Sequence, residues 1–151
     1  MTSEASRLIV PAEVGQLAHV RAFVRDALAH VEAPADAVAD LVQAVDESVC
    51  NVIEHGYAGR PGNVEVTATA SPAEATVTIR DSAPPFDPTA VRSPDVDAPL
   101  GERPLGGMGI HLARTLSDRM VHRILPTGGN ELTLVKSFAG RTRGEIDGDQ
   151  G

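Results

Sequence analysis

The stretch of the chain from which the rest of the fold can be built outward is Asp46-Glu47-Ser48-Val49-Cys50-Asn51-Val52-Ile53-Glu54-His55-Gly56-Tyr57. Its apolar residues recur at helical spacing, and the pattern begins upstream at Val38, which predicts a largely buried helix over roughly residues 35–55. Gly56 follows where a helix C-cap is expected. Glu47 and Asn51 are four residues apart, so their side chains project from one face of this helix, about one turn apart.

This pair of polar side chains has two interpretations. A carboxylate and an amide oxygen at this spacing can serve a Mg²⁺ ion or a water bound to one, because Mg²⁺ takes oxygen ligands and keeps several waters. Taken alone, the pair is explained more simply as a solvated polar face, which Glu54 and His55 would continue. A metal or phosphate site is therefore indicated only if other motifs support it.

The elements on either side of this helix follow from the same patterns. Upstream, a short apolar run at residues 8–10 ends at Pro11 and predicts an edge strand, and a helix is expected over roughly residues 12–32. Downstream, apolar and polar residues alternate over residues 64–69 and 75–80, which predicts a β-hairpin with one buried face.

The second half of the chain repeats the pattern of a helix and a hairpin. Residues 82–106 are rich in proline and lack periodicity, which is typical of a long irregular loop acting as a lid or binding segment. A third helix is expected just after Gly107-Met108-Gly109, and residues 121–125 and 132–138 predict a second hairpin. The sequence therefore predicts an α+β protein: a two-layer sandwich with a mixed, mainly antiparallel sheet and helices on one face.

Length and composition indicate one domain. The chain has 151 residues, which suits a single folded unit, expected here over residues 7–139. Residues 1–6 are expected to be a flexible N-terminus, and the polar, glycine-rich residues 140–151 a disordered tail.

Charge and cysteine usage exclude several classes of protein. The formal net charge of −8 disfavours direct nucleic-acid binding, which requires clustered Lys and Arg. No apolar run approaches the roughly 18 residues of a membrane span, and the first residues lack the pattern of a signal peptide. The single cysteine, Cys50, fits a reducing cytoplasm and is interpreted as a core residue rather than a nucleophile.

Asp81 is the next candidate for a functional role. It stands at the C-terminal end of a predicted strand, where the long loop begins. A carboxylate in this position can accept hydrogen bonds from the amino group of a flat heterocycle such as adenine. An aspartate that merely starts a turn explains the local sequence equally well.

The third candidate is the glycine cluster Gly106-Gly107-Met108-Gly109, which leads into a helix. Glycines let the backbone approach a ligand closely, and a helix N-terminus presents free N–H groups to phosphate. The cluster lacks the Gly-Lys-Ser/Thr of a Walker A loop and the strand–helix setting of a dinucleotide fingerprint. Alone, it could simply form a hinge for the loop.

The order of the three motifs resembles the Bergerat nucleotide-binding fold shared by gyrase, Hsp90, histidine kinases and MutL. Within it, residues 46–57 are similar to the N box of the bacterial anti-sigma factor serine/threonine kinases. Residues 81–88 and 107–112 resemble their first and second glycine boxes, and residues 129–134 their closing strand. The resemblance covers roughly residues 8–138 and implies a histidine-kinase-like ATP-binding domain.

The resemblance implies a role for each motif residue. Glu47 would be the general base and Asn51 the Mg²⁺ ligand. Asp81 would bind the adenine amino group, and Gly107 and Gly109 would lie against the phosphates of ATP.

Further contacts with the nucleotide are implied by the same motifs. They come from Ala83 and Phe86 in the first box and from Met108 and Ile110 in the second. Ala83 stands where the family often has glycine. Thr133, on the closing strand, would support the adenine pocket through a water molecule.

The function implied is that of a protein serine/threonine kinase in a partner switch. It would transfer phosphate from ATP·Mg²⁺ to an anti-sigma factor antagonist and bind a sigma factor as an anti-sigma factor. Relatives of this kind commonly form homodimers, and the first strand and helix offer a candidate surface for this.

Two other interpretations stay open from the sequence. A nucleotide-binding regulatory module with little or no phosphotransfer needs the same pocket, although it has no need of a base at Glu47. A globular domain that binds no nucleotide is the third alternative.

Overall fold

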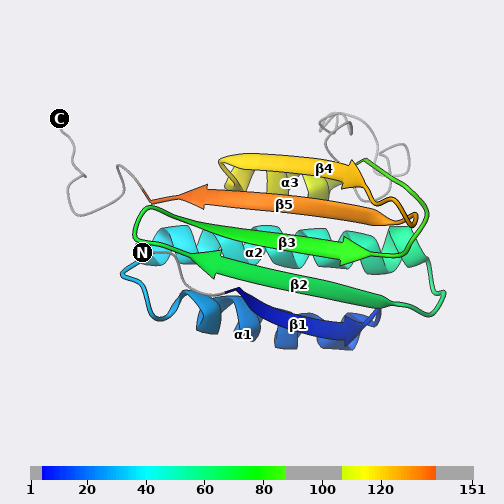
Figure 1. Ribbon diagram of the computed structural model, residues 1–151, viewed down its shortest axis with the longest axis horizontal. Helices are drawn as coiled ribbons and strands as arrows, with labels where there is room; N and C mark the ends of the chain where they lie inside the picture. Colours follow the sequence, from blue (N-terminus) through cyan, green and yellow to red (C-terminus); the bar gives the residue numbers. More distant parts are fainter. Residues whose placement is uncertain (1–4, 88–106, 139–151) are drawn as a thin grey trace.

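The computed structural model describes residues 5–87 and 107–138 of the chain (Figure 1). Its helices and strands, in chain order, are β1 (Ser6–Pro11), a 3-10 turn (Val14–Gln16), α1 (Leu17–Leu28), α2 (Ala35–Asn51), a π-helix (Val52–Tyr57), β2 (Asn63–Ala70), β3 (Glu74–Asp81), α3 (Gly107–Leu116), β4 (Arg119–Ile124) and β5 (Asn130–Ser137).

The five strands form one sheet in the order β1-β2-β3-β5-β4, and each neighbouring pair is antiparallel. All three α-helices lie on the same side of this sheet (Figure 1). The apolar residues of the strands alternate inward toward the helices, so the core fills the space between the two layers. The two-layer α+β fold predicted from the sequence is confirmed.

Several boundaries differ from those predicted. The first helix begins with a 3-10 turn and is α-helical only over Leu17–Leu28, which is shorter than residues 12–32. The third helix starts at Gly107, so it includes the glycines that were expected to precede it. Residues 88–106 of the predicted loop, residues 1–4 and the predicted tail lie outside the described residues.

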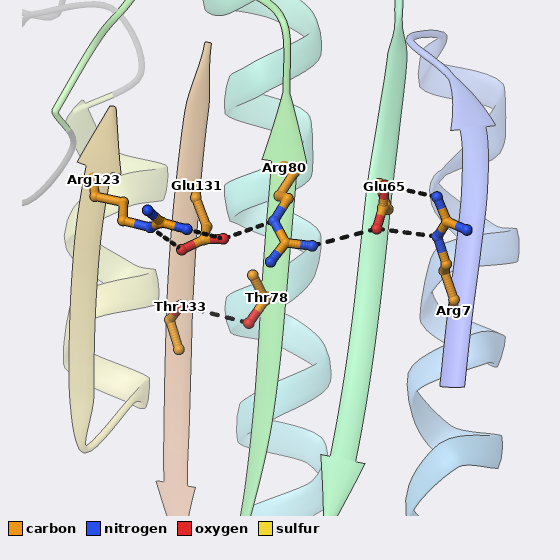
Figure 2. A network of polar contacts seen from close by, with 7 residues as sticks. All are labelled: Arg7, Glu65, Thr78, Arg80, Arg123, Glu131 and Thr133. Atoms are coloured by element: carbon orange, nitrogen blue, oxygen red, sulfur yellow. Dashed lines mark hydrogen bonds and ion pairs between the residues drawn. The ribbon is translucent and has the colours of Figure 1, made fainter. Parts of the chain in front are cut away.

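The sheet face opposite the helices carries a chain of ion pairs that reaches across all five strands (Figure 2). Glu65 on β2 contacts arginines on both neighbouring strands, and Glu131 on β5 does the same. The arginine partners, from β1, β3 and β4, are Arg7, Arg80 and Arg123. Hydrogen bonds from Arg123, and secondarily from Arg80, lower the pKa of the Glu131 carboxyl. These are cross-strand pairs on a solvated face, and they stabilise the pairing of neighbouring strands.

A buried ammonium group on the sheet connects it to the helix layer. Lys136 on β5 is 3% exposed, and its Nζ lies 3.0 Å from Asp40 Oδ2 on α2. The same Nζ donates a hydrogen bond of 2.7 Å to the carbonyl oxygen of Leu116, the last residue of α3. One side chain therefore joins the end of α3 to α2 and to the sheet.

We expect Lys136→Met to lower the free energy of unfolding by about 2–3 kcal/mol, because it leaves Asp40 and the Leu116 carbonyl without their partner. Urea denaturation followed by circular dichroism measures this. The control is Arg7→Ala, which breaks an exposed ion pair to Glu65 and is expected to leave the midpoint unchanged. Equal loss in both variants would contradict a structural role for the buried pair.

Over the ranges that the structure describes, no helix combines the length and the apolar character needed to cross a lipid bilayer.

Candidate functional site

The site is built around Asp81, the last residue of β3. Its backbone is paired with Asn130 at the start of β5, which buries the carboxylate between two central strands, and Asp81 is only 8% exposed. Oδ1 accepts hydrogen bonds from the Ala83 backbone N–H at 2.9 Å and from Asn130 Nδ2 at 3.0 Å. Among the described residues no group donates to Oδ2, so this oxygen is left for a ligand.

Burial is the main influence on the ionisation of Asp81. It raises the pKa of the carboxyl, while hydrogen bonds from Asn130 and Ala83 and the nearby His122 act in the opposite direction. Two donors to one oxygen stabilise the ionised form that a hydrogen-bond acceptor needs.

A small pocket opens beside the carboxylate. Its walls come from α2, the π-helix, the segment after β3, α3, β4 and β5. They are formed by Ser48, Asn51, Val52, Gly56, Asp81, Ala83, Phe86, Ile110, His122, Asn130 and Leu132. A mostly apolar wall with one buried carboxylate suits a flat heterocycle that carries an amino group.

A second, more polar hollow adjoins this pocket. It is lined by Glu47, Cys50, Asn51, Glu54, His55 and Gly109. Asn51 lines both hollows and is 9% exposed, so its side chain marks the point where they meet. The site thus has an apolar end at Asp81 and an acidic end at Glu47.

The acidic end depends on close contact between α2 and α3. A Cβ added to Gly109 would lie 2.8 Å from Glu47 Oε1, so a larger residue at this position would displace the end of the Glu47 side chain. Gln43, one turn earlier on α2, donates a hydrogen bond of 2.6 Å to Glu47 Oε2. The hydrogen bond to Oε2 holds the Glu47 carboxylate beside the start of α3.

The donor set at this end fits a magnesium ion that arrives with a phosphate ligand. Mg²⁺ in such sites uses one or two protein oxygens together with phosphate and water. The side-chain oxygens available are those of Glu47, Asn51 and Glu54. In the described part of the chain no three His, Cys, Asp or Glu side chains are grouped to hold a metal by themselves.

The wall between the two ends is a π-helix, a conformation that is uncommon and often found at functional sites. Gly56 lies in it, and a Cβ there would be 3.2 Å from the Cβ of Ala83. Tyr57 ties the π-helix to the end of β3, because its hydroxyl accepts from Ser82 N at 2.8 Å and donates to the Asn63 carbonyl at 2.7 Å.

Ala83 needs no special backbone conformation here. In the described residues only Ala58 among the non-glycine residues has a positive φ, so alanine at position 83 is unstrained. The Ala83 methyl instead faces Gly56. Alanine at position 83 therefore packs against a small residue.

Most of the predicted site residues are brought together. Those that line one of the two hollows are Glu47, Asn51, Asp81, Ala83, Phe86, Gly109 and Ile110. Gly107 and Met108 lie in the first turn of α3, and their side chains are outside the described residues. Their predicted contacts with phosphate stay predictions.

Thr133 is not brought to the pocket, and its predicted role needs correction. Its hydroxyl lies 3.5 Å from that of Thr78 on the open face of the sheet, beside the ion pairs of Figure 2. Side chains alternate along a strand, so Thr133 faces away from the helices because its neighbour Leu132 lines the pocket.

Two of the pocket residues that were not predicted from the sequence lie beside Asp81. Asn130 contacts Asp81 directly, and His122 on β4 lies behind it with its Nε2 2.9 Å from Asn130 Oδ1. The strand alternation that puts Leu132 inward also puts Asn130 inward, so the sequence carried a signal for Asn130. The position of His122 depends on the pairing of β4 with β5, which the sequence does not specify.

Cys50 lies on the rim of the acidic hollow rather than in the core. Burial, followed by the hydrogen bond and charge of Glu54, raises the pKa of its thiol to about 11. The thiol is therefore protonated at neutral pH, which disfavours a nucleophilic role.

Gly129 allows the β4–β5 turn to pass close to Asp81. Its φ is +107°, and an added Cβ would contact the Asp81 carbonyl and lie 3.1 Å from Ser82 Cα. We expect Gly129→Ala to destabilise the protein by about 3 kcal/mol. Gly128→Ala, at φ +84° with open space around it, is the control and should cost only about 1 kcal/mol. Thermal unfolding compares them, and equal losses would refute the contact at Asp81.

Three kinds of similarity to known proteins agree with this geometry. The family model for the histidine kinase-like ATPase domain matches residues 10–136. The serine/threonine-protein kinase BtrW of Bordetella bronchiseptica is 28% identical over 100 residues, which cover 66% of this chain and 70% of that protein. The serine-protein kinase RsbW of Bacillus cereus is 23% identical over 150 residues, which cover 97% of this chain and 92% of that protein.

A solved structure supports the fold. The crystal structure of the RsbU and RsbW domains of Rv1364c from Mycobacterium tuberculosis matches with a TM-score of 0.60 and 22% identity. The match covers 89% of this chain but only 32% of that much longer one. It confirms the predicted architecture.

Proposed function

The chain belongs to the family of histidine kinase-like ATPase domains, and on this premise we propose that it is a protein serine/threonine kinase that uses ATP and Mg²⁺. The observation that carries the proposal is the buried Asp81 carboxylate, with one unshared oxygen, in an apolar pocket that continues into the acidic hollow at Glu47. No other region of the described chain combines these features.

In the proposed complex the adenine ring occupies the apolar pocket. Its exocyclic amino group donates to Asp81 Oδ2. Ile110 on α3 contacts the ring from the helix layer, and Leu132 on β5 contacts it from the sheet. The triphosphate extends past Asn51 toward the first turn of α3, where backbone N–H groups and the positive end of the helix dipole favour negative charge.

The phosphate end supplies charge compensation and a base. Asn51 would hold the Mg²⁺ ion through its amide oxygen, and the ion, when bound, neutralises charge on the phosphates. Glu47, fixed by Gln43 and by the contact with Gly109, has a carboxylate placed to accept a proton.

The transfer step follows from this arrangement. Glu47 takes the proton from a serine or threonine hydroxyl of the partner protein as its oxygen attacks the γ-phosphorus in line. The new O–P bond forms while the bond to the β-phosphate oxygen breaks, and ADP leaves. Most of the rate comes from positioning and electrostatic stabilisation, with the base contributing the proton transfer.

The protein partners are proposed from the relatives. The names of BtrW and RsbW describe serine or serine/threonine protein kinases. We propose that this chain phosphorylates an anti-sigma factor antagonist in the cytoplasm and, as a homodimer, binds a sigma factor when the antagonist is phosphorylated.

Two measurements test the proposed function. Isothermal titration with ATP and with ADP, each with and without Mg²⁺, tests the pocket, and saturable binding is expected for both nucleotides. Incubation with γ-labelled ATP and the purified anti-sigma factor antagonists of the same organism tests transfer. Binding without transfer to any antagonist would leave a nucleotide-dependent regulatory module, and absence of binding would refute the proposal entirely.

A further inference from the structure

We infer that Asn130 and His122 form a positioning pair that sets the base preference of the site for 6-aminopurines over 6-oxopurines. The inference rests on the proposed nucleotide site and adds two residues to it. Asn130 is 7% exposed, and the His122 side chain is 4% exposed. Buried polar side chains are retained where each of their hydrogen bonds has a partner, so the partners of this pair can be followed atom by atom.

The amide nitrogen of Asn130 faces three oxygens. Nδ2 lies 3.0 Å from Asp81 Oδ1, 3.1 Å from the Pro84 carbonyl and 3.4 Å from the Ala83 carbonyl. An amide has two N–H hydrogens, and both are directed to these protein acceptors. The opposite orientation of the amide would place its oxygen against three other oxygens, so it is excluded.

The amide oxygen of Asn130 is held equally firmly. Oδ1 accepts a hydrogen bond of 2.8 Å from the Phe86 backbone N–H and lies 2.9 Å from His122 Nε2. Since an amide oxygen can only accept, His122 Nε2 must carry a hydrogen and donate it. This donation is available to both the neutral and the charged imidazole.

The other ring nitrogen of His122 faces a carboxylate, a contact that is attractive only when both ring nitrogens carry hydrogen. This nitrogen, Nδ1, lies 3.5 Å from Asp87 Oδ1. The ring therefore lies between Asp87, at the end of the segment after β3, and Asn130 on the neighbouring strand. It prevents the Asn130 amide from rotating, because rotation would bring the amide nitrogen against the Nε2 hydrogen.

The consequence is a pocket that offers a carboxylate acceptor but no amide donor at this point. The free oxygen Asp81 Oδ2 attracts the 6-amino group of a purine. It repels a 6-oxo group, which is also an acceptor. Asn130 holds the other oxygen of this carboxylate, Oδ1, with a hydrogen bond of 3.0 Å, and this keeps Oδ2 as the oxygen left for the base. His122 holds the Asn130 amide through its Oδ1, and so the pair acts through Asp81 rather than by touching the base.

Three triphosphates separate attraction from repulsion at position 6 of the purine: ATP carries an amino group, ITP an oxo group, and purine riboside triphosphate only hydrogen. Their dissociation constants are measured by titration calorimetry with Mg²⁺ on the full chain. For the wild type we expect the order ATP tightest and ITP weakest, with a ratio of about 100-fold between them.

The decisive variants change the donor to Asn130. His122→Phe removes it and is expected to lower the ATP/ITP ratio about tenfold, mainly by weaker ATP binding, because Asn130 then holds the Asp81 carboxylate less firmly. His122→Gln keeps an N–H at the reach of Nε2 and should restore the wild-type ratio. Asn130→Ala should also lose most of the ratio, with weaker ATP binding.

A general loss of packing would weaken all three nucleotides alike, so the ratio distinguishes positioning from stability. His122→Asn, whose shorter amide cannot reach Asn130, serves if the phenylalanine variant does not fold. A wild-type ratio in both the donor-removing variant and Asn130→Ala would overturn the inference while leaving the proposed function intact. Failure of the wild type to bind ATP would instead overturn both.

Discussion

Replacing Asp81 with asparagine is expected to weaken ATP binding by about 100-fold or more. The substitution is nearly isosteric. The remaining oxygen can still accept from the Ala83 N–H and from Asn130 Nδ2, so the surrounding hydrogen bonds persist. The free oxygen becomes an N–H₂ group, which would face the amino group of adenine as donor against donor. Titration calorimetry with ATP and with ADP measures the loss.

The same change should alter nucleotide preference as well as affinity. An N–H₂ at this position can donate to a 6-oxo group, so we expect ITP to bind Asp81→Asn more tightly than it binds the wild type. Asp26→Asn, which removes the same charge from the exposed side of α1, is the matched control and should leave both affinities unchanged. Wild-type affinity for ATP in Asp81→Asn would remove Asp81 from the site.

The effect of Asp81→Asn on stability should have the opposite sign to its effect on binding. Burial raises the pKa of this carboxyl, so the folded state binds the proton more tightly than the unfolded chain does. The ionised carboxylate therefore destabilises the unliganded protein above that pKa, and the penalty disappears as pH falls through it. We expect the variant to be more stable than the wild type at neutral pH, with the difference shrinking in acid. Denaturant unfolding at a series of pH values tests this sign.

Such a trade of stability for ligand binding is typical of functional sites. An apolar or neutral side chain at position 81 would make the unliganded protein more stable than the carboxylate does. The opposing contributions of Asn130 and Ala83 reduce the cost without removing it. The pocket therefore keeps a buried carboxylate that lowers the stability of the core, because ligand binding requires it.

The regular parts of the fold could be predicted from the sequence because each has a local cause. Alternation over residues 64–69 and 75–80 depends only on the two-residue period of a strand, and β2 and β3 follow it. The helical period around Glu47 and Asn51 likewise placed both on one face of α2. The spatial meeting of these two with Asp81 came from the resemblance to a known family and not from local pattern.

What the sequence could not supply is the register between distant strands. Asn130 contacts Asp81 because β3 and β5 pair in antiparallel register at these two positions. A shift of one residue would have put Thr133 on the pocket side and Asn130 outside. The prediction placed Thr133 at the pocket because of the resemblance to a known family. Leu132 and Leu134 are apolar and stand on either side of it, which indicated that Thr133 faces the opposite side of the sheet.

The start of α3 is a second case where local pattern was insufficient. Glycines usually disfavour a helix interior, so Gly107 and Gly109 were expected to precede the helix. In the structure Gly109 lies inside the helix against Glu47, whose carboxylate a side chain at this position would displace. Contact with another helix, rather than propensity, decides the boundary.

That contact sets up the last prediction, Glu47→Gln, which should abolish most of the phosphotransfer and keep ATP binding. Glutamine has the same shape, so the packing against Gly109 and the hydrogen bond with Gln43 can persist. An amide cannot accept the proton of the attacking hydroxyl, so the transfer rate should fall by about 10²–10⁴-fold. Single-turnover transfer from γ-labelled ATP to the antagonist, beside calorimetry with ATP, measures the two properties separately.

Glu54→Gln is the matched control for this prediction. Glu54 lines the same acidic hollow and carries the same charge, but it lies two turns from the residue proposed as the base and has an exposed side chain. If the hollow acted only through its summed negative charge, the two variants would change transfer equally. If Glu47 is the base, only Glu47→Gln loses transfer, because proton removal requires an acceptor in contact with the hydroxyl and not merely a nearby charge. Full transfer by Glu47→Gln would leave the site a nucleotide pocket whose catalytic base lies elsewhere.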